Sequence, residues 1–222
     1  MEISQLAELI GNGTLETFYV IALSTVMAYI LGIPMGIILY ITDKDGLCEQ
    51  KFVNLVLGAV VNLLRAVPFI ILLILIMPFT RLLVGKNIGL NAVIVPLVVS
   101  AAPFVARMVE ASLQEVNQGV IEAAQSMGSS PMQIITKVLL PEAKPSLIVG
   151  AVITLTTILG YSAMAGFTGG GGLGAIAVNY GYYKYEDGIM ILTVVVLVAI
   201  VQLFQIIGMK IVKKSDKRIR NN

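Results

Sequence analysis

Few side chains in this sequence could do chemistry, and the most informative of them lie in residues 121–143, IEAAQSMGSSPMQIITKVLLPEA. Glu122 is a single acid beside small residues there, and its carboxylate could pair with an Arg or Lys across an interface. Most of the remaining chain is apolar enough for lipid. The first question is therefore what this polar segment contacts.

Other chemistry is poorly supported. The chain has no His and one cysteine, Cys48, so neither a zinc or copper site nor an internal disulfide is expected. The glycine run GFTGGGGLG (166–174) lacks the Lys that follows the glycines of a Walker A loop, and a tight turn is the better interpretation. No nucleophile–base set is visible. The sequence predicts a subunit that is not an enzyme and carries no cofactor of its own.

Composition indicates an integral membrane protein. Of 222 residues, 57% are hydrophobic and 13% charged, and the mean hydropathy is +0.91. The net charge of +2 is too small to indicate nucleic acid as a partner. The N-terminus has no Lys or Arg before its first apolar run, so no removable signal peptide is predicted. We expect one transmembrane domain over residues 1–222, with the lipid bilayer as its solvent.

Five stretches are long and apolar enough to span a bilayer as helices. They are residues 17–41, 53–79, 89–109, 146–167 and 188–212. The predicted fold class is therefore all-α, with five transmembrane helices and a long connection at 110–145. Prolines within the second and third spans remove backbone donors, so these helices should pack against other helices.

The basic residues predict the orientation. Eleven of the 15 Lys and Arg residues fall in the first loop, the 110–145 connection with its preceding Arg107, and the tail after the last helix. Three fall on the other side, and Arg65 lies within the second span. We expect a multi-pass protein of the cytoplasmic (inner) membrane, with the N-terminus outside and the C-terminus and the 110–145 connection in the cytoplasm. The tail KIVKKSDKRIR is interpreted as a positive-inside anchor rather than a nucleic-acid or lipid-signalling patch.

Within the 110–145 connection, two short helices are expected. The first ends at Gly128, a residue suited to the left-handed position after a helix. Ser130 and Gln133 form a Ser-x-x-Gln capping box that begins the second. The second helix is predicted to end at Leu140, because Pro141 cannot easily continue it.

One face of the first short helix is rich in small and apolar residues. Its members are Ile121, Ala124, Met127 and Gly128. If exposed, this face would let a soluble partner approach closely. A helix lying on the membrane surface is the alternative, but the segment is poor in Lys and Arg and lacks Trp and Phe.

The segment resembles the cytoplasmic EAA loop of the permeases of ABC importers, which has the form EAA-x3-G-x9-I-x-L-P. Here Glu122, Ala123 and Ala124 are followed at the same spacing by Gly128, Val138, Leu140 and Pro141, with Val in place of Ile. The resemblance implies that Glu122, Ala123, Ala124, Gly128, Leu140 and Pro141 form a coupling helix and its flank, bound by a separate ATPase that holds ATP and Mg²⁺.

Two further stretches resemble the permeases of methionine importers in particular: LLRAVPFIILL (63–73) and GYSAMAGFTGGGGLGAIAVNYGYYKY (160–185). The resemblance implies import of methionine, as both L- and D-enantiomers and derivatives. It also implies delivery by an extracytoplasmic binding protein or lipoprotein, which residues 181–188 could contact. A permease for another amino acid or small solute is the alternative.

The substrate pathway or gate is expected around Arg65 and Pro68, because an intramembrane Arg must face protein or a watery cavity. A structural Arg at a helix contact is the alternative. By resemblance, Tyr161, Ser162 and Met164 border the pathway, although ordinary helix packing would also explain them.

One copy would form only half of a sealed pathway, so a homodimer with two ATPase subunits is expected. An ion-coupled carrier is a less favoured reading, because no acid lies well inside a predicted span.

Overall fold

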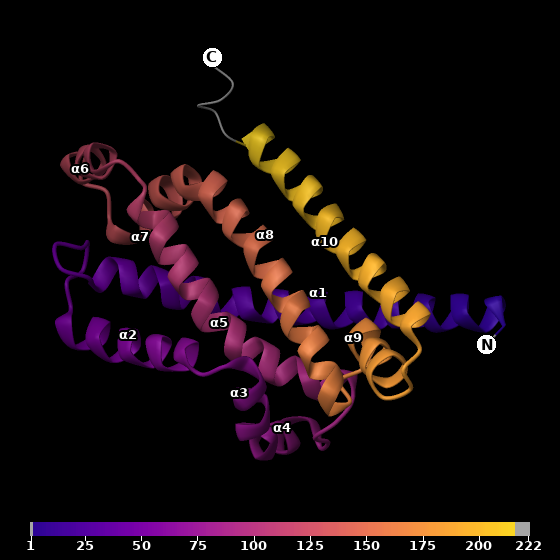
Figure 1. Ribbon diagram of the computed structural model, residues 1–222. Coiled ribbons are helices and arrows are strands. Elements are labelled where there is room, and N and C mark those ends of the chain that lie inside the picture. Colours follow the sequence, from indigo (N-terminus) through magenta and orange to yellow (C-terminus); the bar gives the residue numbers. More distant parts are fainter. Residues whose placement is uncertain (1, 216–222) are drawn as a thin grey trace.

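The computed structural model describes residues 2–215, and all regular structure in that range is helical (Figure 1). The α-helices are α1 (Ile3–Thr42), α2 (Lys51–Ala66), α3 (Phe69–Leu75), α4 (Met77–Val84), α5 (Leu90–Gln114), α6 (Gln118–Ser126), α7 (Pro131–Ile134), α8 (Leu140–Met164), α9 (Gly172–Ile176) and α10 (Asp187–Ser215). Two π-helical segments, η1 (Ile135–Leu139) and η3 (Ala177–Tyr182), and a 3₁₀ turn, η2 (Ala165–Thr168), join some of them. The prediction of an all-α chain is confirmed. The tail residues Lys217, Arg218 and Arg220 lie outside the described range.

Helix α5 is the most buried of the long helices and packs along α1. The two helices approach closely because Gly32 and Gly36 of α1 face α5. A Cβ atom at Gly36 would lie 2.5 Å from the carbonyl oxygen of Ala106, and one at Gly32 would lie 2.6 Å from Val105. Small residues at such contacts let two backbones pack together where lipid provides no hydrophobic driving force between helices.

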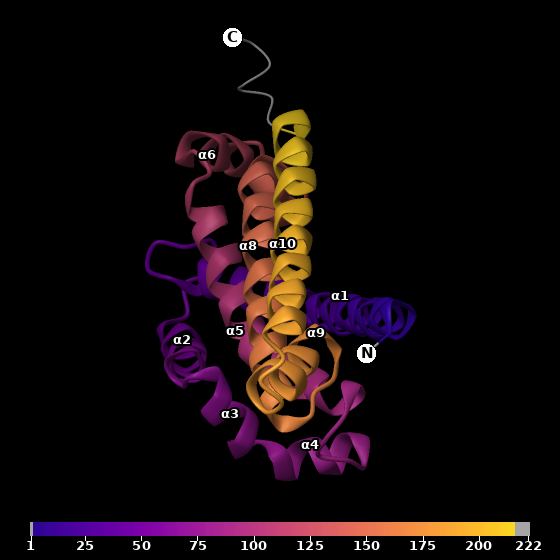
Figure 2. The same ribbon diagram turned by 45° about the vertical axis from the view of Figure 1, so that its right-hand side comes forward.

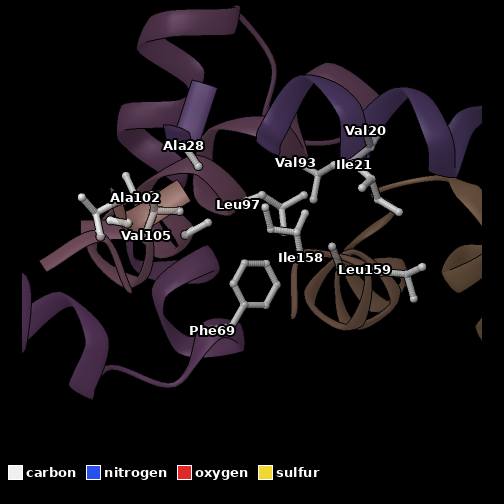
Figure 3. Close-up of a cluster of buried hydrophobic side chains, with 14 of the residues drawn as sticks. Val20, Ile21, Ala28, Phe69, Val93, Leu97, Ala102, Val105, Ile158 and Leu159 are labelled. Carbon is white, nitrogen blue, oxygen red and sulfur yellow. The ribbon is translucent and has the colours of Figure 1, made fainter. Parts of the chain in front are cut away.

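A buried apolar cluster joins α1 and α5 to α3 and α8 (Figure 3). The side chains labelled there are Val20, Ile21, Ala28, Phe69, Val93, Leu97, Ala102, Val105, Ile158 and Leu159. Phe69, the first residue of α3, points into this cluster. The short helix α3 is therefore part of the core rather than a surface loop.

Among the described residues, four helices are each long and apolar enough to cross a bilayer: α1, α5, α10 and the continuous run Pro131–Thr168 that contains α8. Helices α2 and α3 pass the same test together as a bent pair. Counting this pair as one span gives the five spans expected from the sequence.

The second predicted span, 53–79, is wrong as a single helix. Helices α2 and α3 are bent by 105°, and a separate helix, α4, begins at Met77. Pro68 causes the break. Its ring disfavours the helical conformation at the preceding residue, and Val67 is extended with φ −79° and ψ 123°.

The first helix is longer than predicted, because it begins at Ile3 rather than at residue 17. Its 40 residues correspond to about 60 Å of helix, roughly twice the thickness of a bilayer's hydrocarbon core. Figures 1 and 2 show α1 crossing α8 and α10 at a steep angle. Its N-terminal turns therefore extend beyond the bundle (Figure 1).

The connections gather at two ends of the molecule. At one end, residues 43–47 after α1 border α6, and Val212 near the end of α10 lies beside Glu115 and Glu142. At the other end, the backbone of Gly89, before α5, donates a hydrogen bond to the carbonyl of Gly169, after η2. The first end carries the coupling loop, and the second carries the glycine run.

Candidate functional site

The local structure of the 121–143 segment follows its capping residues. Asn117 begins α6, and its side chain accepts a hydrogen bond of 2.8 Å from the backbone N–H of Gly119. Gly128 follows α6 with φ +76°, the left-handed conformation predicted for it. The Ser130–Gln133 capping box is also confirmed: the Ser130 N–H donates to Gln133 Oε1 at 2.8 Å, and the Gln133 N–H donates to Ser130 Oγ at 3.4 Å.

The prediction that the second short helix ends at Leu140 is wrong. The chain passes from α7 through the π-helical turns of η1 directly into α8. The backbone N–H of Leu140 donates to the carbonyl of Ile135, five residues earlier. This wider turn precedes Pro141, which lacks an N–H, so the helix accommodates the proline instead of stopping.

The predicted exposure of one face of α6 is wrong for two of its four residues. Ile121 and Ala124 are each 4% exposed and belong to the main core cluster. They share a helical face as expected, but that face packs against the chain itself. Glu122 and Ala123 are exposed on the other side of α6, and Met127 and Gly128, predicted for the same face as Ile121, are exposed directly after the helix. The surface available to a partner is therefore the Glu122–Ala123 side of α6.

The remaining residues of the EAA pattern lie where α7 and η1 lead into α8. Gly128 is exposed in the turn, Leu140 is half-buried and Pro141 is exposed. Val138 is also half-buried and packs against the core. The aliphatic positions of the pattern and Ala124 thus pack the segment against the core, whereas Glu122, Ala123 and Gly128 face outward.

A polar cavity of about 270 Å³ separates α6 from the loop after α1. Carboxylates of Asp43, Asp45 and Glu122 line it, together with one Lys and three Gln side chains. With more acidic than basic groups, such a notch favours a cationic side chain. Its position beside Glu122 makes it part of the same surface.

Only some of the residues predicted to line the substrate pathway lie close together in the structure. Arg65 lies in the last turn of α2 and is exposed, and no ion pair or hydrogen bond to its side chain is found within residues 2–215. Pro68, at the bend, is also exposed. Tyr161 of α8 stacks on Phe69, directly after that proline, with 4.7 Å between ring centroids. The structure therefore brings Tyr161 to the bend beyond Arg65.

Ser162 and Met164 lie further along α8. The Ser162 hydroxyl donates to the carbonyl of Leu159 at 2.8 Å, which satisfies it within its own helix. Met164, the last residue of α8, is 51% exposed. Of the two, only Met164 presents its side chain to an open surface.

The glycine run holds its turn through α1, a link that sequence reasoning missed. The Gly172 N–H donates to Glu16 Oε2 at 2.7 Å, and the Leu173 N–H donates to Thr17 Oγ1 at 2.9 Å. Gly171 and Gly172 both have positive φ values, which agrees with the tight turn predicted for this run. A lone acid just before an apolar run was the available signal for Glu16.

A second missed group is the ion pair between Arg107 and Glu110, 2.6 Å long, inside α5. The predicted span 89–109 contains Arg107 but ends one residue before Glu110. The sequence does contain a sign of this ion pair, because two opposite charges three residues apart face each other on a helix. Within residues 2–215 no cluster of three or more metal-ligating side chains is found.

Comparisons with known proteins match this chain to transport permeases over most of its length. Residues 28–221 match the family model of the binding-protein-dependent transport system inner membrane component. The chain is 50% identical over 212 residues to the probable D-methionine transport system permease protein MetI of Vibrio cholerae, covering 96% of this chain and 94% of that protein. It is 49% identical over 158 residues to the D-methionine transport system permease protein MetI of Salmonella typhimurium, covering 71% of this chain and 73% of that one.

Among solved structures, the fold is similar to a chain of the MetNI methionine ABC transporter in an inward-facing conformation. The TM-score is 0.96 at 45% identity, covering 98% of this chain and 100% of that chain. The chain therefore belongs to the inner-membrane components of binding-protein-dependent transport systems, as a multi-pass permease and not an ATPase.

Proposed function

We propose that this chain is the permease subunit of an ATP-driven importer that moves methionine, as both enantiomers and close derivatives, into the cell. The observation that carries the proposal is the whole-chain similarity to methionine permeases, 50% identical in sequence and with a TM-score of 0.96 in structure. The chain supplies the membrane pathway, and ATP and Mg²⁺ bind to a partner.

The partner is a pair of ABC ATPase subunits that dock at the coupling loop. Exposed Glu122 and Ala123 provide the contact, with Gly128, Leu140 and Pro141 shaping the loop and buried Ala124 seating α6 on the core. The acidic notch beside Glu122 would receive a Lys or Arg of the ATPase.

Two copies of the chain would line one pathway at a two-fold axis. In a single copy Arg65 is an exposed cation on a helix of the membrane region, and such a charge is costly unless it meets protein or water. A second copy and a water-filled path would meet that requirement. Arg65, Pro68, Tyr161, Ser162 and Met164 are the residues we assign to this path or its gate.

The end with the coupling loop is assigned to the cytoplasm and the end with the glycine run to the outside, because basic residues concentrate near the first. The outer end carries exposed aromatic side chains, of which Phe167 and Tyr182 contact each other at 6.0 Å between centroids. These are candidates for contact with a methionine-binding protein. Closure of the ATPases would draw the two coupling loops together and open the path to the outside.

The first test is co-purification of the tagged chain from its own membranes, compared with Glu122→Arg. We expect an ABC ATPase to accompany the native chain and to be depleted with the variant. Glu186→Arg is the matched control, since Glu186 is an exposed acid at the opposite end. Absence of any ATPase from all preparations would contradict the proposal.

Substrate is tested in proteoliposomes that contain the purified complex and its binding protein. Labelled L- and D-methionine should enter only with ATP. Uptake driven by an ion gradient without ATP would instead identify a secondary carrier. Competition by another amino acid in preference to methionine would reassign the substrate.

A further inference from the structure

A charged network in the inner half of α5 ties that helix to α2. Arg107 Nη1 donates to Oε2 of Glu110 at 2.6 Å. Arg107 Nη2 donates to Oδ1 of Asn62 on α2 at 3.0 Å, and makes a longer contact of 3.5 Å with the carbonyl oxygen of Gly58. One guanidinium therefore bridges two helices through charge-assisted hydrogen bonds.

The neighbouring residues pack closely around this guanidinium. Gly58 is buried, and a Cβ atom there would lie 3.4 Å from Nη2 of Arg107. The Glu110 side chain is only 10% exposed and that of Arg107 27%. Beside the network, Leu39, Val61 and Ala106 form a small buried cluster that also joins α1, α2 and α5.

A largely buried charged network is an expensive way to join two helices. Burying two charges costs more than burying two apolar side chains of similar size. In addition, Nε of Arg107 is buried without an acceptor among the described residues. Apolar packing alone would hold α2 against α5 at lower cost, which points to a role for the fixed geometry of the network.

The network lies between the two regions assigned to function. Arg107 is two helical turns before the end of α5 at Gln114, and α6 begins at Gln118. Asn62 is one turn before Arg65, and the bend at Pro68 follows. A movement of the inner end of α5 would therefore be transmitted through Arg107 and Asn62 to α2, just before its bend.

We propose that Arg107 is a positioning residue that fixes α2 to α5, so that movement of the coupling loop is passed to the bend at Arg65 and Pro68. The inference rests on the proposed ATP-driven transport and names a residue that couples the ATPase contact to the path. Arg107 itself touches neither the ATPase surface nor the residues assigned to the path.

The test measures substrate transported per ATP hydrolysed, in proteoliposomes that contain permease, ATPase and binding protein. Asn62→Leu removes the side-chain acceptor on α2, leaving only the longer contact with the Gly58 carbonyl, and keeps the Arg107–Glu110 pair intact. We expect the ratio to fall by about fivefold or more, the lower range of coupling between two sites, while ATP hydrolysis continues. Asn62→Asp keeps a side-chain acceptor and should transport as much substrate per ATP hydrolysed as the native complex.

Asn54→Leu is the matched control, because Asn54 lies on the same helix but donates to the Leu39 carbonyl of α1 at 2.8 Å. Its loss should leave the ratio unchanged. A second variant, Arg107→Met with Glu110→Leu, replaces both charges with apolar side chains. It should assemble with undiminished thermal stability and still show the lowered ratio.

The outcomes separate the inference from the proposed function. If the native complex transports with ATP but Asn62→Leu and the double variant both keep the native ratio, the network is only structural and the inference is overturned. The same follows if Asn54→Leu lowers the ratio equally. Failure of the native complex to couple uptake to ATP would overturn the proposed function instead.

Discussion

The ring of Tyr161 on α8 lies flat against the ring of Phe69 at the start of α3, with 4.7 Å between the centroids and 4° between the ring planes. Phe69 is 5% exposed and belongs to the main core, whereas Tyr161 is only half-buried. The pair therefore joins the segment after the bend to the outer half of α8.

Replacing Tyr161 by Ala should loosen this contact. An aromatic pair contributes about 1 kcal/mol beyond the area that it buries, so the melting temperature of the purified permease should fall by about 2–4 °C or more. Tyr161→Phe keeps the ring and should melt within about 1 °C of the native chain. Equal loss in both variants would show that the hydroxyl, not the stacking, is what matters.

The close approach of α1 and α5 can be tested at Gly36. Gly36→Ala places a methyl group 2.5 Å from the Ala106 carbonyl oxygen, and two helix backbones must separate to admit it. We expect a loss of about 1–3 kcal/mol from overpacking, seen as a lower melting temperature and poor yield. Gly11→Ala on the same helix meets nothing within 4 Å and should be neutral or slightly stabilising. A neutral Gly36→Ala would mean that the two helices pack less closely than described.

At the outer end, Glu16→Ala should release the turn at Gly172. The lost hydrogen bond joins a carboxylate to a backbone N–H at 2.7 Å, a type of bond that contributes about 1.5–3 kcal/mol when shielded from water. Glu16 is only half-buried, so we expect about 1 kcal/mol, measured as thermal stability. Glu16→Gln retains an acceptor and should lose less. Glu8→Ala, an exposed acid on the same helix, is the control and should have no effect.

Gly128 provides a test of the coupling loop that leaves Glu122 intact. Its φ of +76° costs a β-branched residue such as Val about 1–2 kcal/mol, although a Cβ there would meet nothing within 4 Å. Gly128→Val should thus shift the turn after α6 and lower the amount of ATPase that co-purifies. Gly128→Asn tolerates the left-handed conformation and should bind ATPase nearly as well as the native chain. Equal binding by Val and Asn variants would remove this turn from the docking surface.

Local signals in the sequence were sufficient for the all-helical fold class and for the caps of the coupling loop. The Ser130–Gln133 box and the left-handed Gly128 depend on residues within a few positions of each other. The size of the bend at Pro68 was not predictable, because the apolar character of residues 53–79 is continuous across it. A proline marks a break, but neighbouring helices decide its angle.

Contacts between distant residues account for the other differences. Periodicity placed Ile121 and Ala124 on one face, but it could not say whether that face meets a partner or the chain's own core. The bond from Gly172 to Glu16 joins positions 156 residues apart, and no single-sequence pattern identifies such a pair. For the same reason, the contact between Arg107 and Asn62 became visible only once α2 and α5 were placed side by side.

The π-helical turns of η1 have a consequence for the direction in which the coupling loop faces. Each residue of an α-helix advances the chain by about 100° around the helix axis, and the π turn inserts one additional residue into the ladder between α7 and α8. Deleting one residue from 135–139 would allow an uninterrupted α-helix, but α6 and α7 would then be rotated by about a quarter of a turn relative to α8. One additional residue in this segment therefore sets the direction in which the coupling loop faces. Insertions or deletions at 135–139 should reduce ATPase binding far more than side-chain substitutions there.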